Sequence, residues 1–403
     1  MTTLPVLEAP PAAPAAPPIE PLLGVYRRPA MEFVHGAGVE LIDAAGNAHL
    51  DFTSGIGVNA LGYADAGIAR AAREALDAGI VHASNLFHTR PARALANALV
   101  ARSFASSAFF CNSGAEANEG AFKFARRWAR RAGGESRTTI LALRGGFHGR
   151  LFASLAATDR PEYRAPFAPL AGNVAIVERD LDEVAQALQG GTVAAVIAEP
   201  VQGEGGVRVL ARELLAGLRA LTREHGAALI LDEVQCGLGR TGALFAHEHA
   251  GIAPDLMTLA KPLAGGLPMG AVLMSDEIAA AIQPGDHGST FGGGPVVAAV
   301  ALHVLERLSD RALLTRVRGD GEWLGDALRA MAARGGRVRA VRGIGFMWGI
   351  DVMQPAAEVI ARARAAGLLL CSAGEYTIRL LPPLVATRDD LVRGLSLLDS
   401  SLA

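Results

Sequence analysis

Short apolar runs alternate with longer amphipathic stretches over the first two thirds of the chain. The short runs are typical of strands buried on both faces, and the longer stretches repeat apolar residues every three or four positions, as helices do. The predicted strands are 138–143, 193–200, 227–234, 256–261 and 270–275, and the predicted helices are 66–79, 90–102, 114–131, 181–189 and 211–225. This alternation predicts an α/β fold, with a largely parallel sheet covered by helices on both faces. Ligands of such sheets bind at the carboxyl ends of the strands.

The pattern is different at both ends of the chain. Residues 39–52 alternate around a Gly/Asn turn and predict a β-hairpin. A long helical pattern runs from Pro295 to about residue 333, and it is followed by predicted strands at 338–351 and 377–381 and helices at 355–366 and 388–401. We therefore expect a small α+β domain of residues 23–60 and 295–403 and a large domain of residues 61–294. Residues 1–22 carry seven prolines among alanines and predict a disordered leader.

Composition excludes several classes of function. The chain has 403 residues, 51% of them hydrophobic and 19% charged, which is ordinary for a soluble globular enzyme. A net charge of −2 gives no reason to expect nucleic acid or an anionic membrane as a partner. Three widely spaced cysteines, with no signal peptide and no run of about 18 apolar residues, predict a cytoplasmic protein.

Lysine occurs at only two positions, Lys123 and Lys261, in a chain that otherwise uses arginine. Lys261 is the only charged residue of the stretch LMTLAKPLAGGLPMG, residues 256–270. Apolar surroundings favour the neutral amine, which attacks aldehydes to form a Schiff base, and arginine cannot do this. The stretch therefore indicates pyridoxal phosphate (PLP) chemistry. The alternative is an ordinary lysine at a strand end with its amine in solvent.

A second motif, FFCNSGAEANEG, predicts the start of a helix after a strand that ends near Cys111. Ser113 and Glu116 have the spacing of a capping box, and Gly114 permits close approach to the backbone. The free N–H groups and the dipole of such a helix start can hold a phosphate. The alternative is a plain helix cap that holds no ligand.

Carboxylates follow two of the predicted strands. Asp232 ends the apolar run ALILD, where a buried carboxylate needs a cationic partner; the PLP pyridinium nitrogen is one, and an arginine or a loop cap are the alternatives. Glu199 and Glu204 follow another buried strand, where acid–base work and pairing with an arginine are equally plausible. His148 lies in GGFHGR, after Phe147, which could stack on a ring or belong to the core.

Two further patterns are rejected as sites. GLGRTG, residues 237–242, matches a dinucleotide fingerprint but opens no evident helix and has no acid about 20 residues later. His247 and His249 are two residues apart and so point to different sides of a helix. No metal is expected.

Taken together, the motifs resemble the class III (ω-type) PLP-dependent aminotransferases, and within them the acetylornithine/ornithine branch. The resemblance runs from about Tyr26 to the C-terminus through LDFTSGIGVNALG, NSGAEANEGAFKFAR, FHGR, EPVQGEGGV, LDEVQCGLGRTG, AKPLAGGLPMGA, HGSTFGG and IRLLPPL, in this order. It implies a fold type I enzyme, in which a large domain holds a mostly parallel seven-stranded sheet covered by helices and a small α+β domain is attached. It also implies a homodimer with active sites at the subunit interface.

The resemblance also implies roles for residues that hold the cofactor. Lys261 is expected to be the Schiff-base lysine and the proton carrier, and Asp232 to pair with the pyridine nitrogen. Val234 is expected to pack on one ring face and Gln235 to reach the phenolic oxygen.

The other cofactor contacts are expected from the phosphate side and from the second ring face. Gly114 and Ala115 are expected to hold the phosphate by backbone N–H groups, and Thr290 to add a hydroxyl from the other subunit. Phe147 is expected to stack on the ring.

For the substrate, the resemblance implies that Arg150 binds a carboxylate with Ser289 nearby, and that Arg379 binds the α-carboxylate of the oxo acid. Glu204 is expected to pair with Arg379 when an amine donor is bound and to release it for 2-oxoglutarate. Departures from the family pattern, such as Leu151 after FHGR and Arg144 before it, leave the amine donor open.

The expected reaction is transamination of N2-acetyl-L-ornithine with 2-oxoglutarate, which gives N-acetyl-L-glutamate 5-semialdehyde and L-glutamate in arginine biosynthesis. The alternatives are ornithine, succinylornithine, 4-aminobutyrate or another ω-amine as donor. A PLP aminomutase and a non-catalytic PLP-fold binding protein are more distant alternatives.

Overall fold

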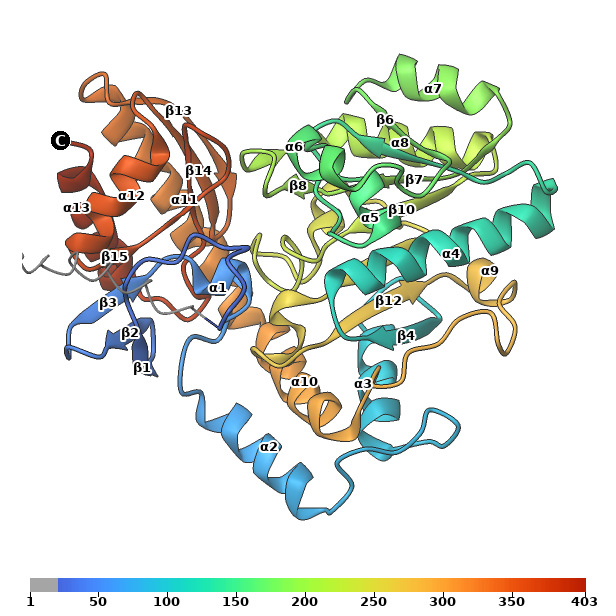
Figure 1. Ribbon diagram of the computed structural model, residues 1–403, viewed down its shortest axis with the longest axis horizontal. Helices are drawn as coiled ribbons and strands as arrows, with labels where there is room; N and C mark the ends of the chain where they lie inside the picture. Colours follow the sequence, from blue (N-terminus) through green and yellow to red (C-terminus); the bar gives the residue numbers. More distant parts are fainter. Residues whose placement is uncertain (1–20) are drawn as a thin grey trace, which may run out of the picture.

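The computed structural model describes residues 21–403. The predicted leader, residues 1–22, lies outside the described residues except for its last two. In Figure 1 the sheet with its covering helices occupies one side of the molecule, and the segments from both ends of the chain, including β1–β3 and α11–α13, lie together on the other.

The central sheet has seven strands in the order β4, β12, β11, β10, β7, β5, β6. Their bounds are β4 (Ser107–Cys111), β5 (Thr139–Leu143), β6 (Val174–Val177), β7 (Val193–Ala198), β10 (Ala228–Asp232), β11 (Leu256–Leu259) and β12 (Gly270–Met274). β12 is antiparallel to both of its neighbours, and the other four pairings are parallel. The predicted mostly parallel seven-stranded sheet is confirmed.

Helices cover both faces of this sheet, as predicted. In β10 the side chains of Ala228 and Ile230 belong to the core that includes helix α4 (Gly114–Gly133). Those of Leu229 and Leu231 belong to the core that includes α7 (Leu181–Gln189) and α8 (Arg212–Glu224). Because successive side chains of a strand point to opposite faces, a strand buried on both sides is a continuous apolar run.

Helix α10 (Pro295–Leu308) packs against α2 (Ala66–Asp77), α3 (Arg90–Val100) and the lysine-bearing turn η3 (Lys261–Ala264). The single helical pattern predicted from 295 to 333 is divided into two helices, α10 and α11 (Arg311–Ala333). Asp310 starts the second helix, because its Oδ1 accepts the N–H groups of Ala312 (2.6 Å) and Leu313 (3.3 Å). A capping residue of this kind starts a new helix but leaves the spacing of apolar residues along the sequence unchanged. The spacing alone therefore predicted one continuous helix.

Two four-stranded sheets lie outside the central sheet. One is formed by β1 (Phe33–Ala37), β2 (Glu40–Asp43), β3 (Ala48–Asp51) and β15 (Leu368–Leu369), and the other by β13 (Val338–Ile344), β14 (Met347–Val352), β17 (Thr377–Leu380) and β16 (Cys371–Ser372). Helices α12 (Ala356–Ala365) and α13 (Arg388–Ser401) pack with them. β2 and β3 form the predicted hairpin, and Leu50 of β3 pairs with Leu368 of β15. The N-terminal hairpin thus joins the C-terminal segment.

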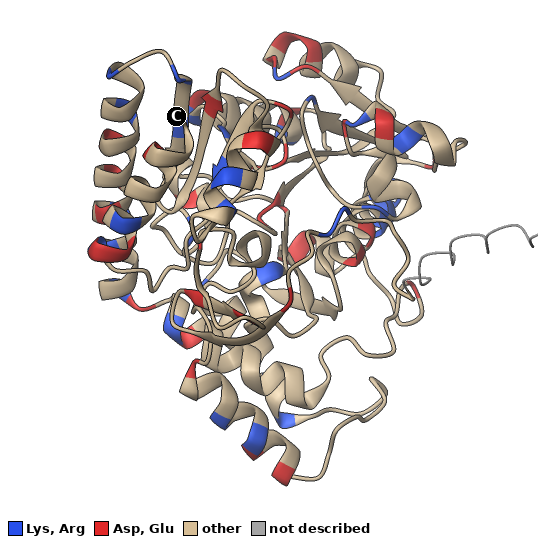
Figure 2. Ribbon diagram, turned by 60° about the vertical axis from the view of Figure 1, so that its left-hand side comes forward, with Lys and Arg blue, Asp and Glu red and all other residues tan. Residues whose placement is uncertain are grey.

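Short elements complete the described chain: α1 (Ser54–Gly57), α5 (Phe152–Ala156), α6 (Pro161–Arg164), η1 (Ala165–Phe167), β8 (Val201–Gln202), β9 (Arg208–Val209), η2 (Ala246–Ala250) and α9 (Asp276–Ala279). Figure 2 shows acidic and basic residues mixed along the same helices rather than gathered by sign. Within residues 21–403, no helix combines the length and apolar character that a membrane crossing requires.

Candidate active site

The loops that follow β4, β5, β7, β10 and β11 converge at one edge of the central sheet and enclose a cavity of about 410 Å³. Nine of the twelve predicted site residues line this cavity: Gly114, Ala115, Phe147, Arg150, Glu204, Asp232, Val234, Gln235 and Lys261. They come from segments far apart in the sequence, and the strand ends bring them together.

Lys261 is the first residue of η3, two residues after the end of β11, and it lines the cavity. Its φ of 28° lies in a region that residues other than glycine rarely adopt, which indicates local strain held by the surrounding structure. Burial lowers the pKa of the Lys261 amine below its ordinary value, and the charge of Arg379 lowers it further. The amine is thus biased toward its neutral, nucleophilic form.

Asp232 ends β10 and is 3% exposed. Its Oδ2 accepts hydrogen bonds from Asn118 Nδ2 (2.8 Å) and His148 Nδ1 (2.8 Å), and its Oδ1 accepts one from Val234 N (3.1 Å). Burial acts to lower the pKa of His148, but the hydrogen bond and charge of Asp232 outweigh it and the pKa is raised. These contacts fix the carboxylate against the cavity wall.

Helix α4 begins at the cavity. Ser113 caps it, because its Oγ accepts the N–H of Glu116 (3.2 Å). The Glu116 carboxylate bonds to Asn112 N (2.7 Å), whereas a capping box would return it to the N–H of Ser113. A Cβ at Gly114 would lie 2.7 Å from Val234 Cγ1, so this position has room only for glycine. The free N–H groups of the first turn form a seat for an anion.

Two arginines belong to the predicted site, and Arg150 lines the cavity whereas Arg379 does not. Arg379, in β17, is 1% exposed; its Nη2 is 2.6 Å from Glu204 Oε1, and its Nη1 donates to Gln235 Oε1 (3.1 Å). Burial acts to lower the pKa of Arg379, but the nearby groups of Cys371 and Glu204 raise it overall. Arg150 places its guanidinium carbon 3.5 Å from the centre of the Tyr163 ring.

Three predicted residues do not line the cavity: Ser289, Thr290 and Arg379. Arg379 contacts two residues that do line the cavity, Glu204 and Gln235. Ser289 is one step removed, because its Oγ accepts from Asn112 Nδ2 (3.2 Å) and Asn112 lines the cavity. Thr290 is exposed on the surface of this chain.

Among the cavity residues that were given no role from the sequence, Asn118 and Glu199 make hydrogen bonds that organise the site. Asn118 donates from Nδ2 to both Asp232 and the His148 carbonyl oxygen, each at 2.8 Å. Its spacing of four from Gly114 puts it on the same helix face, a signal the sequence did contain. Glu199 is paired with backbone N–H groups, and neither alternative from the sequence described this. Burial raises its pKa to about 7.

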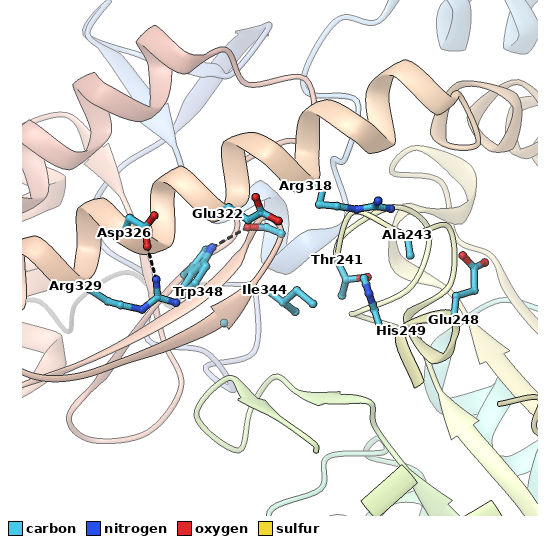
Figure 3. Close-up of a pocket in the computed structure, with 12 residues that line it drawn as sticks. Thr241, Ala243, Glu248, His249, Arg318, Glu322, Asp326, Arg329, Ile344 and Trp348 are labelled. Atoms are coloured by element: carbon cyan, nitrogen blue, oxygen red, sulfur yellow. Dashed lines mark hydrogen bonds and ion pairs between the residues drawn. The ribbon is translucent and has the colours of Figure 1, made fainter. Parts of the chain in front are cut away.

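A larger cavity of about 810 Å³ lies between the 241–249 loop and α11, with Glu248, His249, Arg318 and Glu322 along it (Figure 3). It shares no residue with the lysine-bearing cavity and has no lysine in its lining, so it cannot supply the amine. The GLGRTG segment lies in turns and opens no helix.

The histidines of the rejected metal pattern have protein partners. His247 Nδ1 is 2.7 Å from Glu233 Oε1, and His249 Nε2 is 3.0 Å from Thr241 Oγ1. Within residues 21–403, no group of three or more His, Cys, Asp or Glu side chains is arranged to hold a metal ion.

The family model described as aminotransferase class-III matches residues 25–402. The chain is 44% identical over 382 residues to an acetylornithine aminotransferase of Corynebacterium efficiens, and the match covers 92% of each chain. It matches the crystal structure of an N-acetylornithine aminotransferase from Stenotrophomonas maltophilia with a TM-score of 0.81 and 34% identity, over 93% of this chain and 96% of that one. The fold and the cavity thus define an aminotransferase.

An ornithine aminotransferase from Toxoplasma gondii, whose structure is described as partially occupied by PLP at its active site, matches with a TM-score of 0.91 and 26% identity, over 95% of this chain and 92% of that one. The chain belongs to the class III aminotransferases and is a PLP-dependent transaminase. The predicted family, fold type, enzyme class and cofactor are therefore confirmed, and small amino donors and oxo-acid acceptors are its substrates.

Proposed function

We propose that this transaminase moves the amino group of N2-acetyl-L-ornithine to 2-oxoglutarate, giving N-acetyl-L-glutamate 5-semialdehyde and L-glutamate. The relatives at 38–44% identity that are named acetylornithine aminotransferases support this donor. The observation that carries the reaction class is one cavity with a buried carboxylate, a helix start and the lysine whose pKa is lowered.

The residues of the cavity fit PLP, which would supply an electron sink when the amine-bearing carbon of the substrate loses its proton. Lys261 would hold the cofactor's aldehyde end and, as a neutral amine, would move the proton at that carbon, which is Cδ in the acetylornithine donor and Cα in glutamate. Asp232, held by His148 and Asn118, keeps the ring nitrogen protonated. Its burial makes this carboxylate an effective partner for a cation, since an unpaired buried charge is costly.

Five more residues complete the proposed cofactor site. The N–H groups of Gly114 and Ala115 hold the phosphate at the start of α4, where the helix dipole adds to them. Phe147 and Val234 pack on the two faces of the ring. The Gln235 amide accepts from Arg379 through Oε1, which leaves its N–H₂ to donate to the ring oxygen.

Two arginines recognise carboxylates in this proposal. Glu204 covers Arg379 while the amine donor is bound and leaves it when 2-oxoglutarate arrives, so one cavity accepts substrates of different charge. Arg150 binds the donor carboxylate from its position on the Tyr163 ring. Planar guanidinium groups bind carboxylates through two parallel hydrogen bonds, which fixes the substrate's orientation.

A homodimer is part of the proposal. Leu86, Phe87 and Phe291 are 87%, 72% and 68% exposed, which is unusual for large apolar side chains. They lie near Ser289 and Thr290 in the chain fold, because Asn85 Nδ2 donates to the Ser289 carbonyl oxygen (2.7 Å). A second subunit on this surface would cover the apolar groups and would receive Thr290 at its own cofactor phosphate.

We also propose the two-domain division at residues 60 and 295 and a cytoplasmic location. The joining of β3 with β15 supports a small domain built from both chain ends. Cys111, Cys236 and Cys371 are free thiols, as expected in a reducing compartment.

Another ω-amine donor is the main alternative, and structural relatives named ornithine aminotransferases favour ornithine among them. Arg144, one of the departures from the family pattern, pairs with Glu178 (Nε to Oε1, 2.7 Å) and does not line the cavity. It is therefore not expected to set the donor.

A panel of amine donors with 2-oxoglutarate tests the proposal, with glutamate formation as the readout. We expect N2-acetyl-L-ornithine to give the highest kcat/KM, and Lys261→Ala to lose at least about 10³-fold in kcat. Lys123→Ala, which changes the only other lysine, is the matched control and retains activity. A higher kcat/KM for another amine contradicts the proposed donor. Activity of the Lys261→Ala variant contradicts the proposed role of the lysine.

A further inference from the structure

One buried carboxylate ties together two loops of the active site. Glu199 follows β7 at the cavity wall and is 6% exposed. Its Oε1 accepts the N–H of Phe147 (2.9 Å), in the loop after β5, and its Oε2 accepts the N–H of Gly203 (3.3 Å), in the loop that leads to β9. A single side chain thus holds one N–H from each loop.

Each of the two loops carries a residue with a proposed function. Phe147 is the residue proposed to stack on the cofactor ring. Gly203 directly precedes Glu204, whose carboxylate pairs with Arg379 at 2.6 Å. Gln202 adds a second connection, because its Nε2 donates to the Arg144 carbonyl oxygen (2.9 Å). The position of Phe147 relative to Glu204 therefore depends on contacts between these loops.

We propose that Glu199 is a positioning residue, whose carboxylate holds the Phe147 loop and the Glu204 loop at a fixed separation across the cofactor cavity. This inference rests on the proposed function, because it needs Phe147 to contact the cofactor and Glu204 to control access to Arg379. Glu199 itself forms no bond to the substrate in this account.

The chemistry of the carboxylate explains the choice of residue. An ionised carboxylate has two acceptor oxygens, so it can satisfy two converging N–H donors, whereas an amide has only one. Replacing one oxygen by NH₂ would set a donor against the N–H of Phe147 or Gly203. At a buried position water cannot replace the lost bond, so the backbone group must move or stay unpaired.

The surroundings make this connection sensitive to pH. The ionisable groups that act on Glu199 are His148 and Asp232, and Glu199 in turn acts on Cys236 and Lys261. Burial raises the Glu199 pKa to about 7, and the charge of His148 opposes the rise. Protonation adds an O–H and removes an acceptor, so we expect the two loops to loosen as the pH falls below about 7.

The test compares Glu199→Gln with Glu119→Gln in the holoenzyme. Glu119 Oε1 also accepts two backbone N–H groups, those of Ala153 (3.0 Å) and Ser154 (2.8 Å), but this residue does not line the cavity. The measurements are visible circular dichroism of the bound cofactor, kcat and KM in each half-reaction, and thermal unfolding.

For Glu199→Gln we expect the visible dichroic band to weaken and kcat to fall roughly 10-fold to 100-fold in both half-reactions. KM for 2-oxoglutarate should change by less than about threefold, because Arg379 is retained. Glu119→Gln should keep the dichroic band and kcat near the wild-type values, since one amide oxygen can still accept both N–H groups. If both variants lose only stability, or if kcat falls with an unchanged band, Glu199 does not position Phe147.

A second measurement compares the pH dependence of the two forms. The wild-type dichroic band is expected to weaken on the acid side of about pH 7 and the band of Glu199→Gln is not, whereas an equal weakening in both shows that another group titrates and contradicts the pH dependence assigned to Glu199. This readout does not depend on the amine donor. If the donor panel fails but the band titrates, the proposed substrate is wrong and the role of Glu199 stands.

Discussion

At the scale of single residues, Lys261 combines two unfavourable features. Its backbone has a φ of 28°, and its amine is buried beside Arg379, both of which cost free energy in the folded chain. Such features are retained where function requires them, and in the proposed function the cofactor would remove one of them by taking up the amine. The cofactor-free enzyme must therefore carry a cost that a change at this position would reveal.

We expect Lys261→Met to stabilise the cofactor-free protein at neutral pH. Because the folded-state pKa of Lys261 is lowered, the buried ammonium is destabilising below that pKa and the cost disappears as the pH approaches 10.5, the ordinary value. The gain in unfolding free energy should be about 1 to 3 kcal/mol at pH 7. Urea unfolding at pH 7 and pH 10 measures it, and a gain that is equal at both values contradicts the buried charge.

The site residues differ in how far the sequence predicted them. Lys261 and Asp232 could be identified because each follows an apolar strand, which indicates a buried charge at a strand end. The spacing of Asn118 from Gly114 places it on the cavity face of α4, but it does not reveal the bonds of Asn118 to His148 and Asp232. The bond of Glu199 to Phe147 likewise joins segments more than 30 residues apart, which spacing does not encode. The sequence predicts strand ends and helix starts, but not the bonds between the loops that follow them.

At the scale of elements, the start of α4 is closely packed against the loop after β10. Gly114 lies against Val234, a residue of the loop after β10, so helix and strand approach closely at the proposed phosphate seat. The N–H groups at this end can face an anion only if no side chain intervenes.

Gly114→Ala should therefore weaken cofactor binding by at least about tenfold and destabilise the protein by about 1 to 3 kcal/mol, because its Cβ would lie 2.7 Å from Val234 Cγ1. Gly319→Ala is the matched control: it is exposed in α11 with no atom within 4 Å of the new Cβ. The control should stabilise by up to about 1 kcal/mol, the helix preference of alanine over glycine. Cofactor titration of both variants measures the difference, and equal affinities contradict the tight approach.

The elements themselves were predicted unevenly. The buried strands β7 and β10 were identified because both faces are apolar, but β6 was missed, since its four residues at the sheet edge give too short a pattern. The division between α10 and α11 was missed because the apolar spacing continues past Asp310, and the cap alone marks the break.

At the scale of the whole molecule, the cavity of one chain is expected to be incomplete. Thr290 is exposed beside the strongly exposed Phe291, and the proposed dimer would carry it to the partner's phosphate. The apolar surface and the active site would then depend on each other, since loss of the dimer would also remove a phosphate contact.

Mixed dimers test this. Lys261→Ala and Thr290→Asp should each be nearly inactive as homodimers, the second because its carboxylate would repel the phosphate. A mixed dimer has one intact site, formed by the Lys261 of one chain and the Thr290 of the other, so we expect about half of the wild-type activity per dimer. Activity of the mixture no greater than the sum of the two homodimers indicates that Thr290 serves its own chain.

The order of the chain around the cavity has a consequence for biogenesis. The lining begins at Val58 and continues to Met269, and Arg379 is added only by β17, close to the C-terminus. A growing polypeptide therefore has the whole lining of the cavity before it has the arginine expected to hold the oxo acid, so translation of β17 is the last step that contributes to the site.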